Sequence, residues 1–263
     1  MTTKILQGRT AFVTGGSRGI GAAIARALGE HGADVAVNYH SNAAAAEAVT
    51  AHVIAHGGKA VAVQGDAGDA EQVERMAEQA RAALGDITLL VCNVIGDTRA
   101  LGALFRATGS VVDSLDRVRG VREVTATALD AALLPCHFVV PQMRRRGGGS
   151  IVFIGASGTH SSTPGLAEVS VAKSAQDAVA RSLAVELAPD GIRVNTVAPG
   201  LVPTDANAGP HQEQMIQRVQ GLTPAGTVTT VDEVADTVVA LASDLGRRVT
   251  GVFVPLDGAR TLT

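Results

Sequence analysis

Residues 14–21, with the sequence Thr-Gly-Gly-Ser-Arg-Gly-Ile-Gly, constrain the fold of this chain more than any other stretch. They follow an apolar run over residues 10–13 that predicts a buried parallel strand. They precede an alanine-rich stretch over residues 22–30 that predicts a helix. The chain therefore contains a glycine-rich turn between a strand and a helix.

Each glycine of this turn has an expected role. Gly15 permits the tight turn, Gly19 lets the backbone approach a pyrophosphate, and Gly21 lets the helix pack closely on the sheet. The free N–H groups and the positive end of the helix dipole would then hold phosphates. The alternative is a structural turn with no ligand, because glycine turns are common.

Strand-like and helical segments alternate along the whole chain. Strands are expected at residues 10–13, 34–38, 60–64, 89–93, 150–154, 193–197 and 252–255. The alternation predicts an α/β protein, with a single Rossmann-like, doubly wound parallel sheet covered by helices on both faces. No linker or repeat divides the 263 residues, so one domain over residues 1–263 is expected. The Ala43–Ala46 run is interpreted as part of a helix capped by Ser41 or Asn42.

Composition excludes several functional classes. The formal net charge of −3 gives no basic field, so no nucleic acid partner is expected. No basic-then-apolar leader opens the chain and no apolar run reaches membrane-spanning length, so a cytoplasmic protein without membrane contact is expected. Cys92 and Cys136 lack metal-ligand spacing and are interpreted as buried thiols, and no metal is expected.

The end of the second strand bears on the choice of nucleotide. An acidic residue there would bind the adenosine ribose of NAD, but residues 37–42 read Val-Asn-Tyr-His-Ser-Asn. Arg18, Ser41 and Asn42 instead offer a cation and neutral donors, which suit the 2′-phosphate of NADP(H). A solvated Arg18 and a plain helix cap are the alternatives. Asp66 either meets the adenine amino group or is a turn aspartate.

Several motifs in order together resemble the short-chain dehydrogenase/reductase family, close to its bacterial ketoacyl-reductase type. They cover nearly the whole chain: residues 14–21, Asp66, residues 90–93, Lys173 with its helix, residues 195–200 with Thr204, residues 233–235, and residues 250–251 with 257–258. The resemblance implies hydride transfer between NAD(P) and a carbonyl or alcohol. It places Pro199, Gly200 and Thr204 beside the nicotinamide. The residues expected to bind NADP(H) are Gly15, Ser17, Arg18, Gly19, Ile20, Gly21, Asn38, Ser41, Asn42, Asp66, Ala67, Asn93, Lys173, Pro199, Gly200, Val202 and Thr204.

The catalytic set that the resemblance implies is Asn, Ser, Tyr and Lys, and this chain departs from it. Four residues before Lys173 stands Val169, which has no proton to donate, and the chain's single tyrosine is Tyr39. The Asn position falls on Ala128 and the Ser position on Ala156, with Ser157 one residue away as a substitute. Ile95 replaces a usual glycine. Lys173 is expected to hold ribose hydroxyls, the alternative being a surface lysine.

Three other residues are possible proton donors by residue type. His160 follows Ser157 closely and an imidazole can act as a general acid, although a surface histidine is the simpler interpretation. Glu168 is expected to be solvated. His137 is expected at an interface or in the core. The candidate catalytic residues are therefore Lys173, Ser157 and His160.

Residues 97–127 exceed the family layout by about ten residues. This segment is either a lid, a pocket wall or a partner contact, or it is a solvated loop. Its charged residues include Asp97, Arg99, Arg106, Asp113, Asp116, Arg117, Arg119 and Arg122. Residues 207–223 resemble the family's mobile substrate loop and helix.

Three functions remain open. The first is an NADP(H)-dependent oxidoreductase with an altered proton donor, acting on a small carbonyl, enone or imine substrate. The second is a non-redox cyclase or dehydratase, and the third is a catalytically silent subunit paired with an active homologue. The resemblance also implies a homo-oligomer or hetero-oligomer. It would form through residues 129–140 and 173–187, whose apolar faces are broad.

Overall fold

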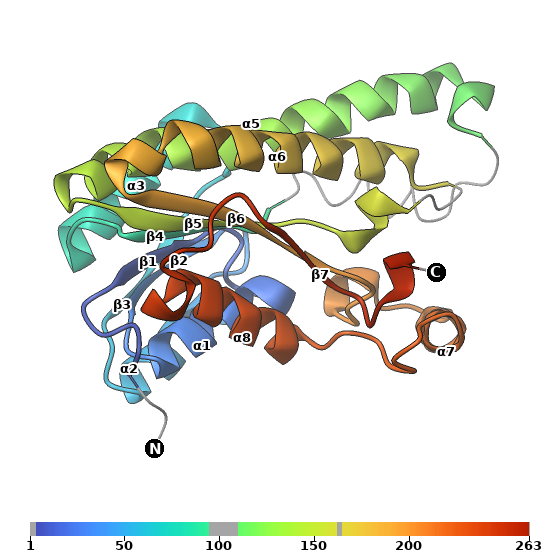
Figure 1. Cartoon of the computed structure of the whole chain (residues 1–263). Helices are drawn as coiled ribbons and strands as arrows, with labels where there is room; N and C mark the ends of the chain where they lie inside the picture. The colour runs from blue at the N-terminus through green and yellow to red at the C-terminus, as the bar shows by residue number, and fades with distance from the viewer. Residues whose placement is uncertain (1–3, 95–109, 162–164, 263) are drawn as a thin grey trace.

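The computed structural model describes residues 4–94, 110–161 and 165–262, apart from the side chain of residue 206. Its centre is a seven-stranded parallel sheet in the order β3-β2-β1-β4-β5-β6-β7 (Figure 1). The strands are β1 (Thr10–Val13), β2 (Asp34–Tyr39), β3 (Ala60–Gln64), β4 (Leu89–Cys92), β5 (Gly149–Ile154), β6 (Ile192–Pro199) and β7 (Phe253–Leu256). The predicted α/β fold is confirmed, and each strand lies within one or two residues of its predicted ends.

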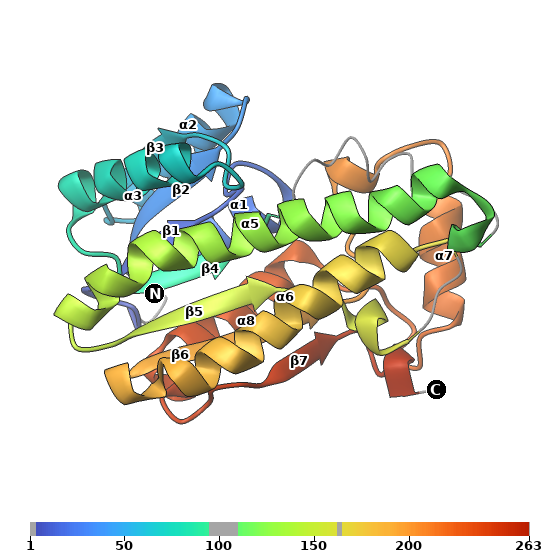
Figure 2. The same ribbon diagram turned by 90° about the horizontal axis from the view of Figure 1, so that it is seen from above.

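The sheet separates two apolar cores because successive strand residues point to opposite faces. On β1, Val13 packs with α1 (Gly19–Glu30), α2 (Ala43–Ala55) and α8 (Val231–Ala242). Phe12, its neighbour, packs on the other face with α3 (Ala70–Leu84), α5 (Leu115–Arg145) and α6 (Ala167–Glu186). Helices therefore cover both faces of the sheet, as Figures 1 and 2 show.

Side-chain caps fix where several helices begin. Asn42 Oδ1 accepts from Ala45 N at 3.0 Å, so of the two predicted caps of α2 Asn42 is the correct one. Asp69 caps α3, and Thr230 forms a capping box with Glu233 at α8. The short helix α7 (Gln212–Gly221) lies within the segment expected to carry the substrate helix.

Helix α5 is much longer than the predicted 129–140 segment. By length and composition it could cross a membrane, so the expectation that no such run exists was wrong. Its apolar side is nevertheless used inside the molecule, since it packs along α6 and against α3 (Figure 2). Cys136 on this helix and Cys92 on β4 are both buried free thiols, as predicted.

Candidate functional site at the carboxyl edge of the sheet

The glycine turn has the geometry that its sequence predicts. Gly15 and Gly19 have φ angles of 61° and 52°, in the left-handed region that favours glycine. A Cβ atom at Gly21 would lie 2.3 Å from the carbonyl oxygen of Gly15, so only glycine fits there. A Cβ atom at Gly19 would lie 3.4 Å from Thr204 Cγ2, which places Thr204 beside the turn.

Two asparagines hold this turn in place. Asn38 Oδ1 accepts from Gly15 N at 2.9 Å, and its Nδ2 donates to Gly65 O at 3.0 Å. Asn93 Nδ2 donates to Thr14 O at 3.1 Å. Because the Asn38 side chain is buried and makes these bonds, it positions the turn, and its direct contact with a nucleotide stays a prediction.

The start of α1 is open to an anion. Its N-cap residue, Arg18, has extended backbone angles and makes no side-chain cap, in contrast to the caps of α2, α3 and α8. The first N–H groups of α1 and the helix dipole are therefore free of a side-chain acceptor. The Arg18 side chain is exposed at the same end. Both features fit a pyrophosphate, and Ser17 and Ile20 flank the opening.

The adenosine end offers neutral donors, and no carboxylate stands at the carboxyl end of β2. Ser41 and Asn42 are exposed after this strand, and the Oδ1 atom of Asn42 is used in its cap. Asp66 is exposed, and its Oδ1 accepts from Gly68 N at 2.8 Å, which is a turn-forming bond. Its neighbour Ala67 is buried. The turn role of Asp66 is thus present, and a role toward adenine stays a prediction.

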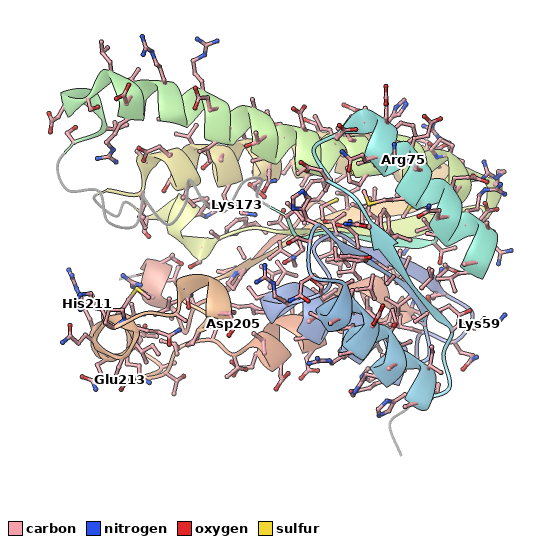
Figure 3. All side chains as sticks on the ribbon, turned by 180° about the vertical axis from the view of Figure 1, so that it is seen from behind. Lys59, Arg75, Lys173, Asp205, His211 and Glu213 are labelled. Atoms are coloured by element: carbon pink, nitrogen blue, oxygen red, sulfur yellow. The ribbon has the colours of Figure 1, made fainter. Side chains whose placement is uncertain are left out.

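Lys173 is buried, with 6% of the residue exposed, on the side of α6 that faces the sheet. Its Nζ donates to Ile154 O at 2.6 Å and to Gln176 Oε1 at 3.0 Å. Burial lowers the pKa of Lys173 to about 8. Figure 3 shows Lys173 and Asp205 toward the carboxyl ends of the strands, with Lys59 at the opposite end. The interpretation of Lys173 as a surface lysine was wrong.

The positions around Lys173 lack an ordinary acid. Val169 lies one helical turn before Lys173 on α6 and is half-buried. Ser157 is buried and begins the short 3-10 helix Ser157–His160 after β5. His160 closes that helix and is exposed, and its ring stacks on Phe253 at a centroid distance of 4.0 Å. Of these three side chains, only Ser157 and His160 carry a transferable proton.

The loop after β6 completes the edge of the site. Pro199 ends β6, and Gly200 N donates to Leu256 O at 2.9 Å. Val202 is buried, and Thr204 forms a capping box with Asn207. The 207–223 segment therefore starts from a fixed point beside the glycine turn.

The expectation that Glu168 is solvated was wrong, because its side chain is 0% exposed. Arg117 Nε donates to Glu168 Oε1 at 2.9 Å, and Arg117 Nη2 donates to Glu168 Oε2 at 3.1 Å. Arg117 Nη2 also donates to Gly165 O at 3.3 Å. These bonds lower the pKa of Glu168 and raise that of Arg117.

The Arg117–Glu168 ion pair attaches part of the 97–127 segment to α6. Residues 115–127 form the first turns of α5, and Arg117 ties them to the start of α6 beside Val169. They form a helix and not a loop, and a role as a lid, a pocket wall or a partner contact stays a prediction. Ile95, Asp97, Arg99 and Arg106 lie outside the described residues.

Sequence reasoning missed Gln176. Its Nε2 donates to Ala128 O at 2.7 Å while its Oε1 accepts from Lys173. Ala128, the expected Asn position, is thereby linked to Lys173 through one side chain. The available signal was a polar residue three positions after Lys173, on the same side of the helix.

One cluster elsewhere has metal-binding residue types. Glu30, His52 and His56 bring their ligand atoms within 4.8 Å of one another. His52 Nε2 lies 2.6 Å from Glu30 Oε1, and the two histidine rings stack at 4.3 Å. The hydrogen-bonding contact between His52 on α2 and Glu30 on α1 accounts for the proximity of these two side chains, and the expectation of no metal stays a prediction.

Comparisons with known proteins agree on the type of molecule. The family model described as Enoyl-(Acyl carrier protein) reductase matches residues 15–259. An uncharacterised oxidoreductase of Methylorubrum extorquens is 38% identical over 96% of this chain and 98% of its own length. A chloroplastic protein of Arabidopsis thaliana, described as NADPH-dependent aldehyde reductase-like, is 30% identical over 96% of this chain and 94% of its own length. The solved short-chain dehydrogenase/reductase from Serratia marcescens has a TM-score of 0.84 at 31% identity, covering 97% of this chain and 99% of that one.

Proposed function

The chain belongs to the short-chain dehydrogenase/reductase family of oxidoreductases, and on that premise we propose that it is an NADP(H)-dependent reductase of a conjugated carbonyl or imine. One observation carries the proposal: Lys173 is present and buried, while Val169 occupies the position at which the family has its acid, a tyrosine. A cytoplasmic location is part of the same proposal.

Three features support the cofactor. The start of α1 lacks a side-chain cap, Arg18 is exposed beside it, and the end of β2 lacks a carboxylate. The relative from Arabidopsis thaliana carries NADPH dependence in its name. When bound, NADPH supplies the hydride. Arg18 and Ser41 would hold the 2′-phosphate, and the third proton of the Lys173 ammonium group is left to donate to a ribose hydroxyl.

The missing phenol limits the substrate class. A ketone that accepts hydride at its carbonyl carbon becomes an isolated alkoxide, which needs a strong acid beside it. A conjugated carbonyl spreads the same charge over an enolate, which takes its proton from water. An imine that enters already protonated becomes a neutral amine when it accepts the hydride and needs no further acid. Ser157 would donate a hydrogen bond to the substrate oxygen, and His160 is the candidate acid at the edge of the site. The Arg117–Glu168 ion pair, which holds the start of α5 to the start of α6, would keep this side of the site in place beside Val169.

Turnover of NADPH with a matched panel of enones, imines and ketones tests the proposal. We expect enone or imine reduction to exceed ketone reduction, and Val169→Tyr to raise ketone reduction while leaving NADPH affinity unchanged. Val169→Phe is the control, since it adds the same ring without the hydroxyl. Saturable NADPH binding without any turnover would favour a silent subunit or non-redox enzyme, and brisk ketone reduction by the unaltered protein would overturn the substrate assignment.

We also propose that copies of this chain, or this chain and a homologue, associate through α5 and α6. Val118 and Leu133 on α5, with Val171 and Val185 on α6, are large apolar side chains with 39–77% exposure. Burial of such a surface drives association. Mass measurement in solution tests this, and a stable monomer at micromolar concentration would overturn it.

A further inference from the structure

The helices α1 and α2 end beside each other, and three side chains with metal-binding groups meet there. Glu30 is the last residue of α1, and His56 is the C-cap of α2, one helical turn after His52. Each side chain offers one ligand atom, and these atoms all lie within 4.8 Å of one another. Two imidazoles and a carboxylate form a ligand set that suits Zn²⁺, with water in the remaining position.

The close packing of α1 on α2 brings these side chains together (Figure 1). A Cβ atom at Gly29 would lie 2.7 Å from Val53 Cγ2, so the helices can approach this closely because residue 29 is glycine. Each helix carries a ligand next to this contact, Glu30 on α1 and His52 on α2. His52 and His56 lie four positions apart on one face of α2, and their rings stack at 4.3 Å. Because the site is built on two packed helices, little ordering is needed to bind an ion.

The hydrogen bonds of the two histidines leave each of them a ring nitrogen for a metal ion. His56 Nδ1 lies 2.8 Å from His52 O. Because a carbonyl oxygen only accepts, Nδ1 carries the proton and the lone pair of the neutral His56 ring is on Nε2. Metal-bound histidines commonly hold their other N–H group in this way. His52 Nε2 lies 2.6 Å from Glu30 Oε1, and an incoming Zn²⁺ would displace the proton of this hydrogen bond.

The spacing of the ligand atoms suits a tetrahedral ion after small movements. Bonds of about 2.0–2.2 Å to nitrogen and oxygen place the ligand atoms roughly 3.3 Å apart. The contact of 2.6 Å between His52 and Glu30 is shorter than this spacing, and the limit of 4.8 Å for the cluster is longer. The side chains of His52 and Glu30 are 32% and 37% exposed, and His56 is exposed. All three can therefore adjust, and water can complete the coordination.

The charges around the cluster favour a cation. The C-terminal end of a helix carries a partial negative charge, and both α1 and α2 end here. The carboxylate of Glu30 adds a full negative charge. Lys4 works against a cation, since its Nζ donates to His56 O at 2.7 Å. Lys4 is exposed, so water and salt screen its charge.

We propose that Glu30, His52 and His56 form a structural binding site for a divalent cation of the zinc type, which joins the ends of α1 and α2. The site goes beyond the proposed reductase function. Because α1 begins at the glycine turn and ends at Glu30, the site lies roughly 17 Å along the helix from that turn. The cation would stabilise the helix pair and take no part in hydride transfer. This proposal departs from the expectation of no metal, which rested on the spacing of Cys92 and Cys136.

Calorimetric titration of the full chain with zinc chloride tests the site. We expect saturable binding of a single Zn²⁺ per chain without competition from Mg²⁺, which prefers oxygen ligands. Glu30→Gln and His56→Gln should each weaken Zn²⁺ binding by at least about tenfold, since loss of even a supporting partner of a ligand costs that much. The matched controls Glu47→Gln and His211→Gln remove the same groups from exposed positions on α2 and before α7 and should leave binding unchanged.

Urea unfolding gives a second, independent readout. In EDTA, His56→Gln should unfold near the same urea concentration as the parent, because the replaced residue is exposed. With Zn²⁺ the midpoint of the parent should rise and that of His56→Gln should not.

Three results would each overturn the proposal: no saturable Zn²⁺ binding by the parent, equal Zn²⁺ affinity in Glu30→Gln and Glu47→Gln, or no rise in the parent's midpoint with Zn²⁺. The cluster would then be a histidine–glutamate hydrogen bond without a metal. None of these results depends on whether the chain binds NADPH or reduces enones.

Discussion

Gln176 accepts a hydrogen bond from the ammonium group of Lys173, with 3.0 Å between Oε1 and Nζ. The same amide donates to Ala128 O at 2.7 Å, so it connects α6 to α5 behind the lysine. Lys173 also donates to Ile154 O at 2.6 Å. These bonds fix the direction of the one ammonium proton that is left for a ligand, and they make Gln176 a positioning residue.

The first prediction concerns Gln176→Leu. The change leaves Ala128 O without its donor and removes one acceptor of Lys173, so the free energy of unfolding should fall by roughly 1–3 kcal/mol. NADPH affinity should fall with it because the lysine is less well oriented. Urea unfolding and fluorescence titration measure the two effects. Gln176→Glu restores the acceptor, and it should recover NADPH affinity better than Leu; equal affinities in both variants would contradict the positioning role.

The second prediction follows from the pKa of Lys173, which burial lowers to about 8. Below this pH the ammonium form predominates and attracts an anionic cofactor, and above it the neutral amine predominates. The Kd of NADPH should therefore rise above pH 8, approaching about tenfold per pH unit for loss of a single proton. Fluorescence titrations between pH 7 and 9.5 measure this slope. Lys173→Met should bind more weakly at pH 7 and show a flat profile, and an unchanged slope in that variant would assign the titration elsewhere.

The third prediction concerns the Arg117–Glu168 ion pair, whose side chains are 14% and 0% exposed. Removing one partner leaves a charge in a buried place, so Arg117→Met should lower the free energy of unfolding by roughly 3–5 kcal/mol. The double variant Arg117→Met/Glu168→Met should lose less, because both charges are gone. Urea unfolding of the two single variants and the double variant gives the coupling energy, and purely additive losses would contradict a direct interaction.

The Arg117–Glu168 ion pair should also make the free energy of unfolding depend on pH. Arg117 holds the pKa of Glu168 below its ordinary value of 4.5. The stabilising contribution is therefore complete above pH 4.5 and is lost as the pH falls through the lowered pKa of the folded state. The difference in unfolding free energy between the parent and Glu168→Gln should accordingly narrow in acid. A difference that stays constant between pH 7 and pH 3 would contradict this assignment.

The sequence predicted the sheet well because its signals are local. The runs that form β1 and β3 are apolar, short and bounded by turn residues, and the glycine turn allows few alternatives. The environments of Glu168 and Gln176 were missed because their partners, Arg117 and Ala128, are 51 and 48 positions away. Such pairs depend on how α5 crosses α6. A charged side chain on a helix is exposed to solvent in most proteins, and this general expectation was applied to Glu168. It failed because Arg117 is packed against Glu168 and pairs with it.

The last prediction tests the glycine turn itself. A Cβ atom at Gly21 would lie 2.3 Å from Gly15 O and 2.8 Å from Asn93 Nδ2, and the first of these contacts is with backbone. Gly21→Ala must therefore displace the turn, which should cost roughly 1–3 kcal/mol of unfolding free energy and weaken NADPH binding more than tenfold.

Gly221→Ala is the matched control, because a Cβ atom there meets nothing within 4 Å at the end of α7. Since alanine favours helix over glycine, this variant should be as stable as the parent or slightly more stable, with unchanged NADPH affinity. Urea unfolding and fluorescence titration on the three proteins separate the effects. If Gly21→Ala keeps the parent's NADPH affinity while losing stability, the turn is only a packing element and the nucleotide binds elsewhere.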